Sequence, residues 1–224
     1  MREARERDDR MAVTFLFVRH GYSTANCDGI FAGNTDVPLT EIGLEQAKRV
    51  SDFIRSTYQV DAVYASQLQR AWRTAELIAA PFGLTVIRDE RLHEICGGKW
   101  DGMTFSEIER TDPGNFTLWR EKPYLVKPPE GETFAEVQRR ALEAVTAIAK
   151  ANDGKRVVVV SHRCLLRTLQ CVWEGRTLAE LDECPWLSNC SVSEVRYERG
   201  RMTPVKTGQD GFLKEIQTAV HSAM

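Results

Sequence analysis

Hydrophobic and polar positions divide the chain into short apolar runs and longer amphipathic stretches. Two runs, residues 14–18 and 157–160, are continuously apolar and rich in phenylalanine or valine. Such runs are typical of strands that are buried on both faces of a parallel sheet. Residues 60–64 form a weaker run of the same kind. We therefore predict three buried strands at these positions.

Amphipathic helices are predicted between and after these strands. Apolar residues recur at helical spacing from Thr40 and from Ser66, and a capping box at Thr133 and Glu136 opens a helix that runs to about residue 150. Helices that alternate with buried strands predict an α/β fold, a three-layer α/β/α sandwich around a mostly parallel central sheet. Two strand-like runs on either side of residues 198–201 predict an antiparallel edge hairpin, where Pro204 is tolerated.

Residues 94–132 break this pattern. Glycine and proline are frequent there, and we predict irregular structure with one short helix, opened by a capping box at Thr104 and Glu107. The segment carries five aromatic residues: Trp100, Phe105, Phe116, Trp119 and Tyr124. One interpretation is a lid-like insertion that forms a substrate wall. The other is a packed excursion with no role in binding.

The length of 224 residues favours one compact domain, which we place at residues 11–224. Residues 1–10 are predominantly charged and are predicted to be a disordered N-terminal extension. Because they contain no apolar core, they do not resemble a secretory signal.

The overall composition narrows the function classes. Hydrophobic residues make up 42% and charged residues 28% of the chain, and the net charge is −2. This balance argues against a nucleic-acid-binding surface, which normally carries a basic excess. No apolar run approaches the roughly 18 residues of a membrane span. The six cysteines form no C-x-x-C pair and match no zinc or disulfide pattern, so we expect reduced thiols and a cytoplasmic protein.

Candidate chemistry lies at the ends of the two strongest strands. His20 follows the first strand and His162 follows the second. Open α/β sheets bind ligands at the carboxyl ends of their strands, so these histidines are predicted to face one another. Arg70 falls in the first turn of the helix after the weaker strand, beside backbone amides that favour an anion. Each residue alone has an ordinary structural explanation, but together they indicate a ligand site.

An anion fits these residues better than a metal ion. A zinc site needs neutral imidazoles together with carboxylates or thiolates. Arg19, Arg70 and Arg163 instead place fixed positive charge near both histidines. A guanidinium repels a cation and matches the geometry of phosphate. The sequence therefore predicts a phosphate site without a metal or another cofactor.

The order of the motifs resembles the histidine phosphatase superfamily, in its phosphoglycerate-mutase-like branch. The resemblance covers about residues 14–197. It rests on Arg19-His20-Gly21 with Asn26, Asp36-x-Pro38-Leu39-Thr40, Ser66-x-Leu68-x-Arg70-Ala71, Leu92-x-Glu94, Gly131-Glu132-Thr133, Val160-Ser161-His162 and Asn189-Cys-Ser-Val192.

The resemblance implies that the site residues act on a phosphate monoester. His20 would be the nucleophile that becomes phosphorylated, and a neutral attacking nitrogen requires its other nitrogen to donate a hydrogen bond. Arg19, Arg70 and His162 would hold the phosphoryl oxygens. Asn26 and Ser23 would add neutral donors, and backbone amides after His162 would complete the phosphate site.

Glu94 would act as the general acid for the leaving alcohol and then as the base for water. Its alternative is an ion pair with one of the arginines. Arg163 stands where many relatives carry glycine. It either points into solvent or offers a cation to a second anionic group on the substrate.

The activity expected from this resemblance is metal-independent hydrolysis of a small phosphorylated metabolite. A cofactor-dependent phosphoglycerate mutase is the first alternative, and a non-catalytic sensor or scaffold for a phosphoryl ligand is the second. The expected partner is a small-molecule phosphate ester rather than a nucleic acid or a membrane. A homodimer stays open.

Overall fold

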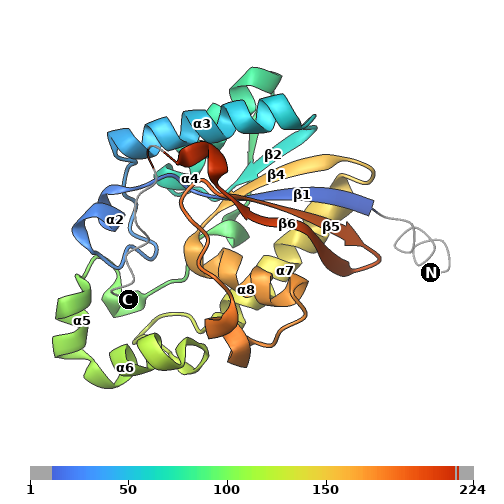
Figure 1. The fold of residues 1–224 in the computed structure, drawn as a ribbon. Helices are drawn as coiled ribbons and strands as arrows, with labels where there is room; N and C mark the ends of the chain where they lie inside the picture. The colour runs from blue at the N-terminus through green and yellow to red at the C-terminus, as the bar shows by residue number, and fades with distance from the viewer. Residues whose placement is uncertain (1–11, 215, 217–224) are drawn as a thin grey trace.

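The computed structural model describes residues 12–214 and residue 216. The charged extension predicted at residues 1–10 lies outside the described residues. The described chain forms one six-stranded sheet, in the order β3-β2-β4-β1-β5-β6, with helices on both faces (Figure 1). The strands are β1 Ala12–Arg19, β2 Ala62–Ala65, β3 Val86–Arg88, β4 Arg156–Ser161, β5 Val192–Glu198 and β6 Arg201–Gln209.

The first four strands of the sheet order run parallel, and the last two form an antiparallel hairpin at one edge. Pro204 lies in the outermost strand, β6, where a missing amide donor is tolerated. The predicted α/β/α sandwich with a mostly parallel sheet and an antiparallel edge hairpin is confirmed. The short edge strand β3 has too few apolar positions to give a sequence signal, and the prediction missed it.

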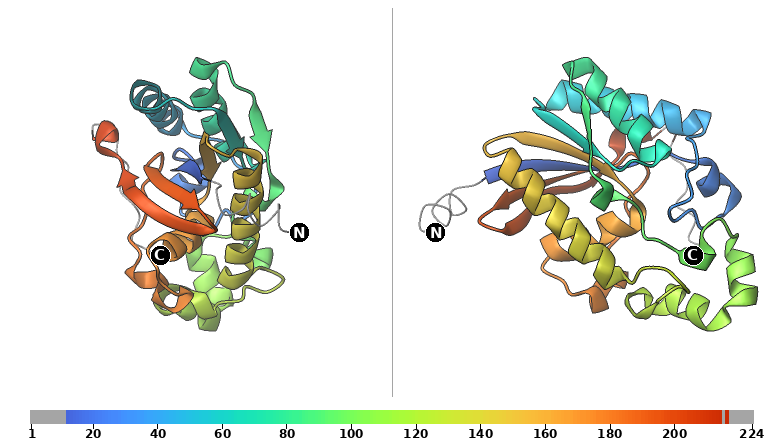
Figure 2. Two further views of the ribbon diagram at one scale, coloured as in Figure 1. Left: turned by 90° about the vertical axis from the view of Figure 1, so that its right-hand side faces the viewer. Right: turned by 180° about the vertical axis from the view of Figure 1, so that it is seen from behind.

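Successive residues of the central strands point to opposite faces of the sheet, and each face is covered by its own helices. The longer helices are α3 Glu41–Thr57, α4 Gln69–Ala79, α7 Phe134–Ala151 and α8 Arg163–Trp173, and α2 Thr24–Asp28 is short. Leu16 and Val18 of β1 belong to the cluster under α3 and α4, while Phe15 and Phe17 belong to the cluster with α7 and α8. Burial on both faces explains why β1 reads as a continuous apolar run. Figure 2 shows the three layers.

Residues 94–132 contain more helix than the sequence analysis predicted. The segment contains α5 Phe105–Thr111 and α6 Pro113–Glu121 as well as the short 3₁₀ helices η3 Gly98–Trp100 and η4 Pro123–Leu125. Asp112 caps α6, and Pro113 occupies its first position, where proline is favoured. The prediction treated this proline as a break, although at the first helical position it is a helix start.

The remaining short elements are 3₁₀ helices. They are η1 Ala80–Phe82, η2 Glu90–Leu92, η5 Leu178–Glu183 and η6 Gly211–Leu213. No helix among the described residues has both the length and the apolar character needed to cross a membrane.

The register of β1 against β4 positions the two candidate histidines. Val18 pairs with Val160 and Arg19 with Ser161, and the backbone amide of His20 donates to the Ser161 carbonyl at 3.0 Å. His20 and His162 therefore leave the sheet side by side at its carboxyl edge. Immediately afterwards the backbone passes so close to Gly43 that a Cβ atom on Gly21 would lie 2.5 Å from the Gly43 carbonyl oxygen.

Candidate active site

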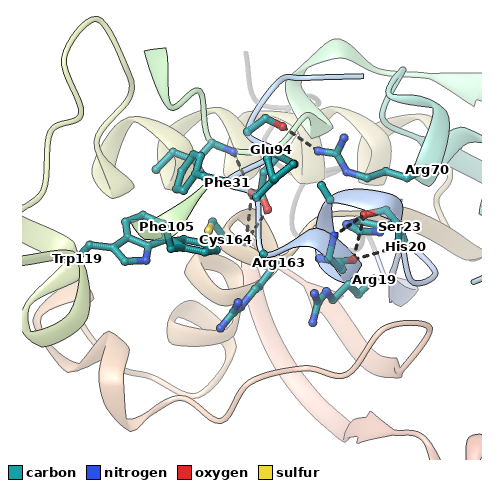
Figure 3. A pocket seen from close by; sticks show the side chains of 17 residues that line it. Arg19, His20, Ser23, Phe31, Arg70, Glu94, Phe105, Trp119, Arg163 and Cys164 are labelled. Atoms are coloured by element: carbon teal, nitrogen blue, oxygen red, sulfur yellow. Dashed lines mark hydrogen bonds between the residues drawn. The ribbon is translucent and has the colours of Figure 1, made fainter. Parts of the chain in front are cut away.

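A pocket opens at the carboxyl ends of β1 and β4 and encloses about 630 Å³ including its open mouth. Its walls come from the loops after β1 and β4, from α4 and from residues 94–132 (Figure 3). Seven of the eight predicted site residues line it; they are Arg19, His20, Ser23, Asn26, Arg70, Glu94 and Arg163. The eighth, His162, lies directly behind this lining and has no exposed surface.

His20 is held in one tautomer. Its Nδ1 lies 2.7 Å from the carbonyl oxygen of Gly21, which can only accept, so Nδ1 carries the proton and donates. The Nε2 atom is then left with its lone pair. Burial, followed by the charges of Arg70 and Arg19, holds the pKa of His20 well below 6.5. The ring is therefore neutral at neutral pH, as a nucleophile requires.

His162 lies beside His20, with 5.1 Å between the ring centroids. Within the described residues neither of its ring nitrogens has a hydrogen-bond partner, although the side chain is fully buried. Burial and the charge of Arg70 also hold the pKa of His162 well below 6.5. Because a buried imidazole without a partner is costly, this ring is suited to a ligand that supplies the missing bond.

Arg19 enters the same region from the end of β1. One guanidinium nitrogen donates to the Leu187 carbonyl at 2.7 Å, while its Nε is buried and has no partner among the described residues. Burial, with the nearby charge of Arg163, lowers the pKa of Arg19 to about 9. The group stays cationic at neutral pH, and a nearby anion would compensate for its desolvation.

Arg70 is fixed by backbone carbonyls, with Nη1 donating to Thr35 at 2.8 Å and Nη2 to Gly33 at 2.7 Å. The side chain is only 1% exposed. Arg70 lies in the first turn of α4, as predicted. However, the Gln69 amide there donates to the Asp36 carboxylate at 2.7 Å, so this amide is taken by the protein rather than open to a ligand.

Ser23 and Asn26 first of all organise α2. Ser23 caps the helix, and its hydroxyl donates to Asn26 Oδ1 at 3.1 Å. Asn189 donates to the backbone carbonyl of His20 at 2.8 Å and to Asn26 Oδ1 at 3.4 Å. This network fixes the loop that carries His20. A direct role of Ser23 or Asn26 in phosphate binding stays a prediction.

The carboxylate of Glu94 binds the backbone amides at the start of α8, where the sequence analysis expected a phosphate group. Its carboxylate accepts from the Cys164 amide at 3.1 and 3.2 Å and from the Leu165 amide at 3.4 Å. We expected backbone amides after His162 to contact phosphate, but these two bind the acid instead. A carboxylate at a helix N-terminus is electrostatically favourable, which explains the arrangement. Within the described residues, these amide hydrogen bonds rather than an ion pair with an arginine hold the Glu94 carboxylate.

Arg163 stacks on an aromatic ring at the side of the pocket. Its guanidinium carbon lies 3.4 Å from the centroid of Trp186, and that of Arg167 lies 3.7 Å from the same ring. Arg167 also pairs with Asp182 at 3.4 Å. Arg163 is therefore part of a packed surface that faces the pocket rather than a side chain extended into solvent.

The sequence analysis missed three contributors to the site. Asn189 was quoted within a motif but was not assigned to the site, and its amide secures the loop of His20. Trp186 and Phe31 carried no usable signal, since a lone aromatic residue in a loop is more often packing than recognition. Tertiary structure alone brings Trp186 against Arg163 and Phe31 into the pocket wall.

Across the part of the chain that the structure describes, no group of three or more histidine, cysteine, aspartate or glutamate side chains could hold a metal ion. The positive charges at the pocket are Arg19, Arg70 and Arg163, and Glu94 is the acidic side chain in its lining. Such a pocket is suited to a dianion such as a phosphoryl group.

A parallel-sheet edge with paired histidines and clustered arginines is an arrangement suited to binding a phosphoryl group. The chain matches the histidine phosphatase superfamily (branch 1) over residues 15–210. It therefore belongs to that superfamily.

Individual relatives include both phosphatases and mutases. Phosphoserine phosphatase 1 of Hydrogenobacter thermophilus is 32% identical over 215 residues, which cover 95% of this chain and all of the relative. A 2,3-bisphosphoglycerate-dependent phosphoglycerate mutase of Methylorubrum extorquens is 33% identical over 177 residues, covering 75% and 83%. The solved structure of Bacillus stearothermophilus YhfR is 33% identical and covers 90% of this chain and 99% of its own, with a TM-score of 0.86. These similarities support enzymatic phosphatase activity.

The two buried histidines should make the protein sensitive to mild acid. Both have a folded pKa well below the ordinary 6.5, so below that pH the unfolded chain binds more protons than the folded one. The free energy of unfolding should therefore fall as the pH drops through about 6.5 and below. His162→Gln should make this decline shallower by up to about 1.4 kcal/mol per pH unit. Urea unfolding between pH 7.5 and 5 measures it; equal slopes in both proteins would contradict the prediction.

Proposed function

We propose that the protein is a metal-independent phosphomonoesterase that works through a phosphohistidine on His20. The observation that carries this proposal is the fixed tautomer of His20. Its Nδ1 donates to the Gly21 carbonyl, which leaves the lone pair on Nε2 of a side chain that lines the pocket. Arg19 and Arg70 supply positive charge in the same pocket, so a metal ion is not required to neutralise a phosphoryl group.

In the first step, His20 Nε2 attacks phosphorus, and the bond between phosphorus and the ester oxygen breaks. Arg19, Arg70 and His162 hold the phosphoryl oxygens and stabilise the charge that develops on them. The buried Nε of Arg19 and the ring N–H of His162 support this assignment, because each lacks a partner among the described residues and a phosphoryl oxygen would accept a hydrogen bond from it.

Glu94 transfers the protons in both steps. It donates to the alcohol oxygen as that group leaves, and then accepts a proton from the water that attacks the phosphohistidine. This second attack breaks the bond between phosphorus and nitrogen and releases inorganic phosphate. Glu94 is 8% exposed and lines the same pocket as His20, which supports its contact with both the alcohol and water.

The apolar end of the pocket, opposite His20, favours hydrolysis over the mutase reaction. A bisphosphorylated mutase cofactor needs several cations for its second dianion. The far wall of this pocket instead contains Phe31, Phe105 and Trp119, and Arg163 is the cation beside it. We further propose that residues 94–132 provide this wall within a single catalytic domain at residues 11–224, and that the substrate is a small phosphate ester.

Arg163 is proposed to bind a second anionic group when the substrate has one. Its stacking on Trp186 restricts the guanidinium, so less conformational entropy is lost when an anion binds. The burial of Arg163 lowers its pKa to about 10, which still leaves it charged at neutral pH.

The central test is to trap phosphate on His20. Wild-type protein mixed briefly with a ³²P-labelled monoester and quenched in alkali should retain label on His20, because a phosphoramidate is stable in base and labile in acid. His20→Ala should lose both label and turnover. Activity of the wild type should survive exhaustive chelation.

The same experiment separates the alternatives. Inorganic phosphate as the product identifies a phosphatase, and label passed to another hydroxyl identifies a mutase. Label on a different residue, or activity that depends on added Mg²⁺ or Zn²⁺, would overturn the mechanism. A properly folded protein that binds phosphate esters without turning them over would indicate a sensor.

Replacement of Glu94 should have an effect that depends on the leaving group. Glu94→Gln should lower kcat/KM about 10²–10⁴-fold for an alkyl phosphate, whose alcohol needs a proton, and far less for nitrophenyl phosphate. Glu130→Gln is the matched control, because Glu130 lies in the same segment with a side chain that is 70% exposed. Equal losses on both substrates would assign Glu94 a structural role.

Arg163→Gln should discriminate between classes of substrate. A charge-assisted hydrogen bond contributes about 1.5–3 kcal/mol, so kcat/KM should fall about tenfold to a hundredfold for monoesters with an additional carboxylate or phosphate. Nitrophenyl phosphate should be nearly unaffected. Arg167→Gln is the control, since it removes a cation from the same tryptophan ring but lies outside the pocket lining. A uniform change, or none, in Arg163→Gln would defeat the proposal.

A further inference from the structure

The pocket has two chemically different ends. At one end lie His20, Arg19 and Arg70; at the other the lining is apolar, and it consists of Ile30, Phe31, Ile95, Phe105 and Trp119. In Figure 3 the side chains of Phe105 and Trp119 lie on the opposite side of the view from His20 and Arg70, and Glu94 lies between the two groups. A leaving alcohol that receives its proton from Glu94 would therefore extend toward the aromatic side chains.

Phe31 is the centre of this apolar end. Its ring makes edge-to-face contacts with Trp119 at 5.1 Å, Trp100 at 5.7 Å and Phe105 at 6.1 Å. Behind it, a Cβ atom on Gly97 would lie 2.4 Å from the Phe31 ring, so the backbone there is in close contact. The four rings, which come from the loop after α2 and from η3, α5 and α6, thus hold one another in place. The surface is formed before a ligand arrives, which lowers the ordering needed for binding.

An apolar wall discriminates between alcohols by the desolvation of their polar groups. The side chains of Ile30, Phe31, Ile95 and Phe105 have no hydrogen-bonding atoms, so hydroxyl groups placed against them would lose water without gaining a partner. Methylene groups or a ring in the same place would bury apolar surface instead. The wall therefore favours a carbon chain or ring over a polyol.

We propose that the site prefers phosphomonoesters whose alcohol has an apolar body, long enough to pass Glu94 and contact Phe105 and Trp119. The proposal rests on the phosphatase function above and specifies its substrate class. It is independent of a second anion, because the guanidinium of Arg163 stacks on Trp186, a residue that is not part of the apolar wall. One substrate can therefore use both surfaces.

A series of straight-chain alkyl phosphates tests the proposal with the wild-type protein. Primary alcohols have nearly the same basicity, so kcat/KM along the series reports the binding of the chain rather than the quality of the leaving group. From ethyl to hexyl phosphate we expect kcat/KM to rise about fourfold for each methylene that is buried, followed by a plateau. The six-carbon polyol phosphate should be hydrolysed more slowly than hexyl phosphate. A flat or falling series would overturn the proposal.

Variants connect the effect to the wall. Phe105→Ala should reduce the ratio of kcat/KM for hexyl over ethyl phosphate at least tenfold, whereas Phe105→Leu should retain most of the chain-length dependence. Leu125→Ala is the control, because Leu125 lies in the same segment, is 54% exposed and does not line the pocket. An unchanged chain-length dependence in Phe105→Ala would overturn the proposal.

The two levels of the proposal fail differently. If no monoester of any length is hydrolysed, the phosphatase function itself is wrong. If ethyl and hexyl phosphate are hydrolysed equally well, the function stands and the apolar leaving-group site is wrong.

Discussion

The parallel pairing of β1 with β4 is the constraint on which the arrangement of the site depends. His20 and His162 are far apart in sequence, and the ladder that ends at Arg19 and Ser161 brings them to one edge. Valines and phenylalanines stabilise that ladder by burial on both faces of the sheet. The same apolar residues that make the strands recognisable in the sequence thus hold the two candidate histidines in place. A slip of one residue in register would turn successive side chains to the opposite faces of the sheet and separate the two rings.

Around these rings the protein concentrates buried positive charge, which is unfavourable until a ligand binds. Arg70 is tied to two backbone carbonyls, and Arg19 to one, so within the described residues uncharged acceptors rather than carboxylates orient both guanidinium groups. The lowered pKa of Arg19 reflects the free energy stored in this arrangement. Under the proposed function, stability given up in this way would be returned as affinity for a phosphoryl group. The same burial and positive charge disfavour protonation of the two imidazoles, so both stay neutral.

The sequence predicted the sheet, the main helices and the positions of both histidines because these depend on local periodicity and on strand order. It predicted the local capping boxes at Thr104 and Thr133, but not the helix termini that are satisfied by residues distant in sequence. The amides of Cys164 and of Gln69 bind carboxylates that are distant in sequence, and only the tertiary fold decides which acid reaches them. The helix α6 was missed because Pro113 has opposite meanings at a helix start and in a helix interior. The stacking of Trp186 on Arg163 and Arg167 of α8 also depends on the tertiary fold, so no sequence pattern indicated it.

The attachment of Glu94 to the first turn of α8 has a consequence for how the site tolerates different ligands. His162 precedes this helix directly, and the Ser161 hydroxyl also donates to the Leu92 carbonyl at 2.7 Å. The segment that carries the acid and the strand end that carries the second histidine are therefore fastened together at two points. Changes in the outer wall can therefore alter the shape of the pocket without changing the spacing between Glu94 and the two histidines. Recognition and chemistry can then evolve separately, with substitutions in α5 and α6 changing what is bound and leaving the reaction intact.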